Sequence, residues 1–156
     1  MKPTIAIRYC LLLAVLILAI SSCKKSGSTP TNLIGIWNEP TNPAGYGRSV
    51  SFGADGSFNA IFVAYPRPDG AGGVSVRSTT IFKGTFTVKR DSLLTHISTM
   101  SVQEDAGTPV VTPSTQKLFE YATYKLNNNQ LTINYTTYPA DAPVPTHVNY
   151  TKAASN

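Results

Sequence analysis

Apolar and polar residues alternate with a period of two along most of the chain after residue 33. Val, Ile, Thr, Tyr and Phe dominate short runs separated by Gly, Pro, Asn and Asp, which is typical of β-strands joined by turns. The pattern favours strands over the 3.6-residue repeat of helices, so the sequence predicts an all-β domain. The predicted strands cover residues 34–38, 48–52, 57–65, 78–89, 93–102, 117–126, 130–138 and 147–153.

Short polar turns join several of the consecutive strands. Residues 53–56 (GADG), 90–91 (RD) and 127–129 (NNN) supply Gly, Asp and Asn, which tolerate the backbone angles of tight hairpins. Successive hairpins indicate antiparallel neighbours, and a meander of eight strands removes its free edges by closing into an up-and-down barrel. Longer segments rich in Pro and Gly are expected to be loops, at residues 66–73, 104–115 and 139–145.

The N-terminal segment has a different pattern. Lys2 and Arg8 flank an otherwise uncharged start, residues 10–20 are apolar, and two serines stand before Cys23. This order is typical of an export signal. Eleven apolar residues at ~1.5 Å per residue reach only about half of a hydrocarbon core, so the run is too short for a membrane-spanning helix. The alternative, a buried core helix, is disfavoured by the basic start and the abrupt polar end.

The tetrapeptide ISSC, residues 20–23, resembles the lipobox of bacterial lipoproteins. The resemblance implies that Cys23 is acylated and becomes the first residue, and that several acyl chains, at ~0.8 kcal/mol per buried methylene, hold the protein on a membrane. Where surface-exported lipoproteins carry acidic residues, this chain has two lysines, so we expect an outer-membrane anchor on the periplasmic face. The expected organisation is a signal peptide (1–22), a lipidated tether (23–31), a barrel domain (32–153) and a short tail (154–156).

Charge and cysteine content lose their significance once the signal is removed. The formal net charge is +5, but four of the thirteen basic residues lie in the signal and the tether. Nine basic and eight acidic residues remain, without a basic stripe, so the domain has no feature of a nucleic-acid-binding protein. Cys10 leaves with the signal and Cys23 is consumed by lipid, which leaves no pair for an internal disulfide.

Catalytic and metal-binding patterns are missing from the sequence. It contains no Gly-x-Ser-x-Gly elbow, no His-Glu-x-x-His pair and no Walker glycine loop. His96, His147 and Glu120 would form a metal or acid–base site only if the fold brought them together, and His96 is interpreted instead as a half-buried packing residue. We therefore expect no enzyme activity, no catalytic residues, no metal and no cofactor.

Four segments together resemble the lipocalin-like domains of bacterial lipoproteins. They are LIGIW (33–37), FGADGSF (52–58), GTFTVKRDSL (84–93) and NNNQLTINY (127–135). The resemblance implies a barrel in which Gly35 permits close backbone approach, Trp37 plugs one end and a cation on the last strand stacks on the tryptophan. That cation maps to Lys152, where the family usually has Arg.

An eight-stranded barrel is either filled by side chains or holds one small ligand. Large and small residues alternate on two predicted strands, which would leave room inside, although a tapered filled core would also need small residues. The sequence does not fix which face of a strand points inward. The candidate ligand-lining residues are Phe58, Ala60, Phe62, Phe82, Gly84, Phe86, Tyr124 and Tyr135.

Two hypotheses of function follow from this pattern. In the first, a membrane-anchored barrel binds a small hydrophobic or amphipathic ligand. In the second, the barrel is filled, and the protein is a non-enzymatic structural or protein-interaction accessory of the cell envelope, with a protein partner that the sequence does not name.

Overall fold

The computed structural model describes residues 30–40, 46–65, 77–105, 107–139 and 142–154. The predicted signal peptide and Cys23 lie outside the described residues. Among the residues described, no helix has the length and apolar character needed to cross a membrane. The described residues form nine strands: β1 (Gly35–Asn38), β2 (Tyr46–Phe52), β3 (Ser57–Ala64), β4 (Ser78–Lys89), β5 (Ser92–Glu104), β6 (Val110–Pro113), β7 (Ala122–Asn127), β8 (Gln130–Thr137) and β9 (Val144–Lys152).

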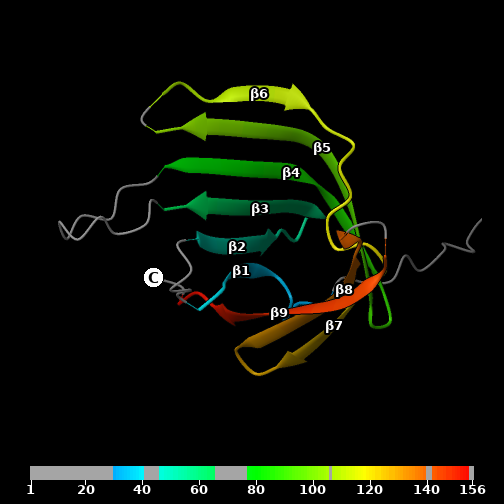
Figure 1. Cartoon of the computed structure of the whole chain (residues 1–156). Coiled ribbons are helices and arrows are strands. Elements are labelled where there is room, and N and C mark those ends of the chain that lie inside the picture. Colours follow the sequence, from blue (N-terminus) through cyan, green and yellow to red (C-terminus); the bar gives the residue numbers. More distant parts are fainter. Residues whose placement is uncertain (1–29, 41–45, 66–76, 106, 140–141, 155–156) are drawn as a thin grey trace, which may run out of the picture.

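Eight of these strands close into an antiparallel up-and-down barrel, as the sequence predicted (Figure 1). Each of β1 to β5 pairs with its sequence neighbour, β7 pairs with β5 and β8, and β9 returns to β1. The β5–β7 and β1–β9 junctions are the narrowest, with two residue pairs each. Because β4 and β5 are 12 and 13 residues long, their far halves extend beyond these junctions.

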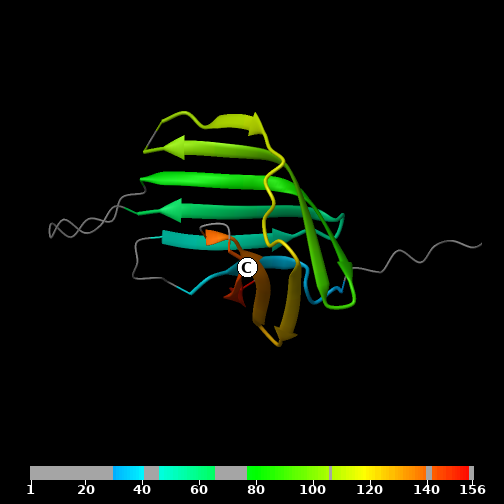
Figure 2. The ribbon, with the colours of Figure 1, turned by 45° about the vertical axis from the view of Figure 1, so that its right-hand side comes forward.

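The up-and-down order places the connections alternately at two ends of the barrel. At one end, here called the closed end, lie the first described residues (30–34), the β2–β3, β4–β5 and β7–β8 turns, and residues 153–154. At the other, the open end, lie the connections β1–β2, β3–β4, β5–β7 and β8–β9. Figure 2 shows the β4–β5 and β7–β8 turns projecting to the lower side, away from the far halves of β3 to β6.

A bulge in β5 separates its two halves. Gly84 pairs with Ile97 and Lys83 pairs with Thr99, so Ser98 is an extra residue, and its hydroxyl donates to the Lys83 carbonyl oxygen over 3.2 Å. A Cβ built at Gly84 would overlap the His96 carbonyl oxygen, so the glycine allows β5 to approach β4. The bulge changes the face of β5 that points inward from odd-numbered to even-numbered residues.

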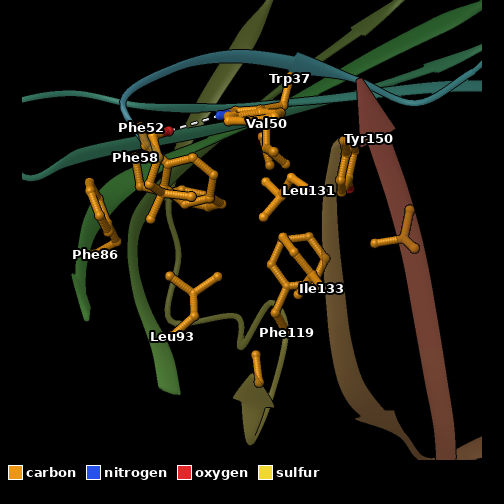
Figure 3. Close-up of a cluster of buried hydrophobic side chains, with 14 of the residues drawn as sticks. Trp37, Val50, Phe52, Phe58, Phe86, Leu93, Phe119, Leu131, Ile133 and Tyr150 are labelled. Atoms are coloured by element: carbon orange, nitrogen blue, oxygen red, sulfur yellow. Dashed lines mark hydrogen bonds between the residues drawn. The ribbon is translucent and has the colours of Figure 1, made fainter. Parts of the chain in front are cut away.

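The barrel interior is packed with hydrophobic side chains from all eight strands and from two flanking segments (Figure 3). Trp37 is fully buried, and its indole nitrogen donates to the Leu33 carbonyl oxygen over 2.8 Å. Phe52 packs against Phe58 and Phe86 with ring centroids 5.4 and 4.9 Å apart. Each such buried aromatic side chain contributes roughly 1.5–3 kcal/mol of hydrophobic stabilisation.

Several details differ from the sequence prediction. The last strand begins at Val144, inside a segment expected to be a loop, and not at residue 147. A ninth strand, β6, lies in a segment expected to be a loop, and it extends the sheet beside the far half of β5. The strand expected to begin at residue 117 begins at Ala122, because Phe119 and Tyr121 have positive φ angles of 55° and 51° that break the extended backbone. His96 is exposed on the outer face of β5 and not half-buried.

Candidate functional site

A charged pair occupies the interior near the open end. Arg48 of β2 has the same parity as the buried Val50 and Phe52, so its side chain enters the barrel. Its Nε and Nη2 atoms donate to the two carboxylate oxygens of Glu39 over 2.7 and 2.9 Å. The Glu39 amide in turn donates to the Arg48 carbonyl oxygen over 2.9 Å, which extends the β1–β2 ladder to the pair. This bidentate pair of hydrogen bonds fixes the guanidinium in one orientation.

The environment of the pair reinforces its charge. The side chains of Arg48 and Glu39 are only 21% and 13% exposed. Hydrogen bonding to Glu39 raises the pKa of the Arg48 guanidinium, so it stays protonated throughout the accessible range. The Arg48 guanidinium carbon also lies 5.3 Å from the centroid of the Tyr46 ring, a cation–π contact at the rim.

Tyr150 brings a buried hydroxyl into the same region. The residue is 1% exposed, and among the described residues its hydroxyl oxygen has no hydrogen-bond partner. Burial strongly raises the pKa of this phenol, while Arg48 lowers it and Glu39 raises it. Tyr150 is therefore a neutral donor held beside the charged pair, at a cost in free energy that a bonded hydroxyl would avoid.

The segment from residue 117 to residue 121 covers the packed core at the open end. Phe119 inserts its ring against Tyr135 and Phe58, with centroid distances of 5.2 and 6.4 Å. The segment is fixed at both ends, because Thr95 donates its hydroxyl to the Leu118 carbonyl oxygen over 2.6 Å and the Thr136 amide donates to the Glu120 carbonyl oxygen over 3.1 Å. The positive φ at Phe119 costs about 1–2 kcal/mol, which its aromatic contacts offset.

Two pockets open beside the charged pair, and both are bounded by Arg48 and Phe62. Their volumes, about 290 and 330 Å³, are at the lower limit for small-molecule sites. The first is lined in addition by Tyr46, Gly47, Val63, Ala64, Ser78 and Thr80. The second is lined by the segment Lys117–Glu120 and by residues 135–138 of β8 and its end. Each pocket is lined by apolar side chains together with side chains that bear hydroxyl groups.

The structure distributes the predicted ligand-lining residues over four environments. Phe58, Ala60, Phe82 and Phe86 point inward but are buried in the packed core. Gly84 lies at the bulge, where it accommodates backbone and does not open a cavity. Phe62 and Tyr135 line the pockets at the open end. Tyr124 lies towards the closed end, where its hydroxyl donates to the Arg90 carbonyl oxygen over 3.4 Å.

The three predicted barrel-closure residues lie together at the other end. Lys152 pairs with Trp37 across β9 and β1, and its ammonium nitrogen lies 5.2 Å from the centroid of the indole ring. The same nitrogen donates to the Asn32 carbonyl oxygen over 3.1 Å. Gly35 has a φ of 131°, and a Cβ there would come within 3.1 Å of Lys152 Cε. Glycine thus fits both the backbone angle and the space beside the lysine.

Sequence reasoning missed Arg48 and Glu39, although a signal was present. Arg48 alternates with Val50 and Phe52 on the same face of a short strand. If these two apolar residues point into the barrel, the arginine does so as well. His96 and His147 are both exposed, and the described part of the chain has no group of three His, Cys, Asp or Glu side chains placed to hold a metal ion.

Comparisons with known proteins leave the site to be interpreted from its own geometry. No protein-family model, no curated protein and no solved structure matches this chain.

Proposed function

We propose that this protein is a membrane-anchored lipoprotein whose barrel binds a small amphipathic molecule at its open end. The observation that carries the proposal is the pair of pockets that share Arg48 and Phe62. One shared residue is charged and fixed by a double hydrogen bond, and the other is aromatic. A hollow that offers both kinds of contact suits a ligand with a polar head and an apolar body.

The charge of the site favours an uncharged head group. Glu39 compensates the guanidinium of Arg48, so the pair has no net charge to offer to an anion. Among the described residues the Arg48 Nη1 atom makes no hydrogen bond, and it can donate to a hydroxyl, carbonyl or ether oxygen. The hydroxyls of Ser78 and Thr80, which line the first pocket, can hydrogen-bond the same head group. A monoacylglycerol or a long-chain alcohol has this chemistry.

The anchoring part of the proposal rests on the sequence. The basic start, the apolar run over residues 10–20 and the lipobox-like ISSC support acylation of Cys23 and an outer-membrane location on the periplasmic face. The up-and-down barrel and the contact between Lys152 and Trp37 support a lipocalin-like domain. In this proposal the protein binds its ligand and does not transform it.

The binding test uses the chain from Lys24 onward, without acyl chains. Trp37 is the single tryptophan and serves as donor to a fluorescent monoacylglycerol, with unlabelled monoolein and oleate as competitors. We expect energy transfer from Trp37 to the bound probe. Monoolein should displace the probe, and so reduce the transfer, more effectively than oleate. Ala64→Phe and Thr137→Phe fill the two pockets and should each weaken binding about tenfold or more, because a filled pocket excludes the acyl chain.

The matched control is Leu94→Phe, which adds the same ring on the outer face, where the side chain is 67% exposed. It should bind like the wild type. Equal binding by all three variants, or an absence of transfer together with native mass spectra of empty protein, would count against the proposed ligand site.

A second candidate function is a non-enzymatic accessory of the envelope with a filled barrel. The packed core favours it, and so does the edge strand β6, where Val110 and Val111 are 64% and 65% exposed. Unpaired edge strands with exposed apolar residues accept other chains. Retrieval of one stoichiometric protein partner by the wild type, but not by a Val111→Lys variant, would support this function.

A further inference from the structure

In the part of the chain that the structure describes, four basic side chains lie at the closed end of the barrel, and one of them, Lys152, borders a hollow. Lys89 and Arg90 lie at the β4–β5 turn, Lys125 lies on β7 near the β7–β8 turn, and Lys152 ends β9. Among the described residues, Asp55 and Asp91 are the acidic side chains at this end. At the open end, three basic residues face four acidic ones, namely Arg48, Arg77 and Lys117 against Glu39, Glu104, Asp105 and Glu120.

Backbone hydrogen bonds join the elements that carry these side chains. The Tyr124 amide donates to the Asp91 carbonyl oxygen over 2.8 Å, which joins the β4–β5 turn to β7 beside Lys125. The Lys152 amide donates to the Asn129 carbonyl oxygen over 2.9 Å, which joins β9 to the β7–β8 turn. Lys152 also borders a hollow of about 650 Å³ that Ile34 and Ile36 line, and Ile36 is 55% exposed.

We propose that the closed end of the barrel is a lipid-facing surface that contacts anionic phospholipid head groups and holds the open end away from the membrane. The inference rests on the proposed acylation of Cys23. We take the partner of this surface to be a membrane because the chain before Pro30 leads back to Cys23, whose acyl chains would lie in the bilayer. Pro30 lies at the closed end, where its carbonyl oxygen accepts from the Leu33 amide over 2.9 Å.

The length of the connection restricts the orientation. Six residues lie between Cys23 and Pro30, so seven Cα–Cα steps connect the two residues and span at most about 25 Å. The first and last Cα atoms of β3 are seven steps of ~3.3 Å apart, or about 23 Å, so a connection that had to reach the open end would be almost fully extended. A membrane against the open end would require the connection to run the whole length of the barrel, whereas the closed end is within easy reach.

Charge and apolar contact agree with this orientation. Each basic residue near an anionic bilayer strengthens binding about fivefold, and exposed aliphatic residues add contact with the head-group boundary. Lys89, Arg90 and Lys125 are exposed and have no ion-pair partner among the described residues. Ile36 and the hollow beside Lys152 supply the apolar part of the surface.

The test measures which end lies near the bilayer, using the full acylated chain reconstituted into vesicles. Ala54→Cys, in the β2–β3 turn, and Thr108→Cys, beyond the end of β5, place a fluorophore at the closed and open ends. The vesicles contain phosphatidylcholine with or without phosphatidylglycerol, and a head-group-labelled lipid is the acceptor. We expect severalfold higher energy transfer from position 54 than from position 108, with a larger difference in anionic vesicles. Equal transfer or the reverse order overturns the proposal.

Flotation of the same vesicles distinguishes a failure of the proposed anchor from a failure of the proposed orientation. Loss of co-flotation shows that the anchor itself fails, and the proposed function and the orientation fall together. Co-flotation with a reversed transfer pattern overturns the orientation alone and leaves the anchor intact.

Charge reversal tests the contact with anionic lipid. The Lys89→Glu/Lys125→Glu variant should reduce the transfer difference in anionic vesicles and leave it unchanged in pure phosphatidylcholine. The matched control, Arg77→Glu/Lys83→Glu, makes the same change in net charge away from the closed end and should behave as wild type. Identical behaviour of both double variants in anionic vesicles contradicts the proposed contact.

Discussion

The two ends of the barrel are built from the same strands but differ in what fills them. At the closed end, two-residue turns join β4 to β5 and β7 to β8, and Trp37 is buried with none of its surface exposed. At the open end, β4 and β5 extend past the barrel junctions, and the interior contains the Arg48–Glu39 pair. The strand pairing is continuous, yet apolar packing gives way to polar contacts.

The difference shows how one barrel can separate stability from binding. Fully buried apolar side chains stabilise the fold, and they can fill the interior completely at the end where no ligand has to enter. Polar groups in the interior cost free energy unless they are bonded, so they persist where they have partners or a use. The open end contains both cases, because Arg48 and Glu39 satisfy each other while the Tyr150 hydroxyl has no partner among the described residues.

The largest effect is expected at the closed end. Trp37→Ala removes a fully buried ring, its bond to Leu33 and the face on which Lys152 stacks. We expect the free energy of unfolding to fall by about 3–5 kcal/mol, because the cavity cannot collapse between paired strands. Chemical denaturation followed by circular dichroism measures the loss. Leu94→Ala, at a residue 67% exposed, should change stability by less than about 0.5 kcal/mol, and a similar loss in both variants would refute the assignment of the core.

A smaller effect on stability is expected at the β5 bulge, which lies between the closed end and the open end. Gly84→Ala places a Cβ against the His96 and Ile97 backbone, which cannot rotate away as a side chain would. The expected loss is about 2–3 kcal/mol of stability. Gly47→Ala is the control, because its Cβ would meet the Tyr65 ring at an ordinary 3.6 Å. A Gly84→Ala protein as stable as wild type would show that β5 can shift freely at Ser98.

The charged pair at the open end should respond to single and double changes differently. Arg48→Met leaves the Glu39 carboxylate, 13% exposed, without its partner, and should cost about 1–2 kcal/mol. Adding Glu39→Gln removes the stranded charge and should recover most of the loss. Thermal unfolding of the two single variants and the double variant measures the coupling. Additive losses would mean that the two residues stabilise the fold independently.

The architecture was predictable because a half-buried strand has a short sequence period. The expected ranges 57–65 and 78–89 match β3 and β4 closely, and the Arg90–Asp91 and Asn128–Asn129 turns lie where the sequence placed them. β6 was not predictable, because a four-residue edge strand that follows one proline and ends in another has the composition of a loop. The bulge at Ser98 was not predictable either, because one unpaired residue leaves the alternation on each side intact.

The candidate site was predictable only in part. Phe62 and Tyr135 were among the predicted ligand-lining residues, and they line the pockets, whereas Phe58 and Phe86 were also predicted but lie deeper in the core. Position along the barrel axis depends on register, which the sequence does not give. Arg48 and Glu39 form their pair across the β1–β2 ladder, nine residues apart in the chain, so only the three-dimensional pairing reveals it.

The smallest expected effect concerns Tyr150 and has the opposite sign. Because its hydroxyl is buried without a described partner, Tyr150→Phe should leave the packing intact and raise the free energy of unfolding by about 0.5–1 kcal/mol. Burial raises the pKa of this phenol above its ordinary value of 10.0, so the unfolded chain releases the proton first. The stability of the wild type should therefore fall as the pH rises above about 10, and the fall should be less steep in Tyr150→Phe. Urea unfolding of both proteins between neutral and alkaline pH measures the difference. If Tyr150→Phe is less stable at neutral pH, the Tyr150 hydroxyl has a hydrogen-bond partner, such as a bound water or ligand. The polar region of the open end then extends further into the barrel than the side chains alone indicate.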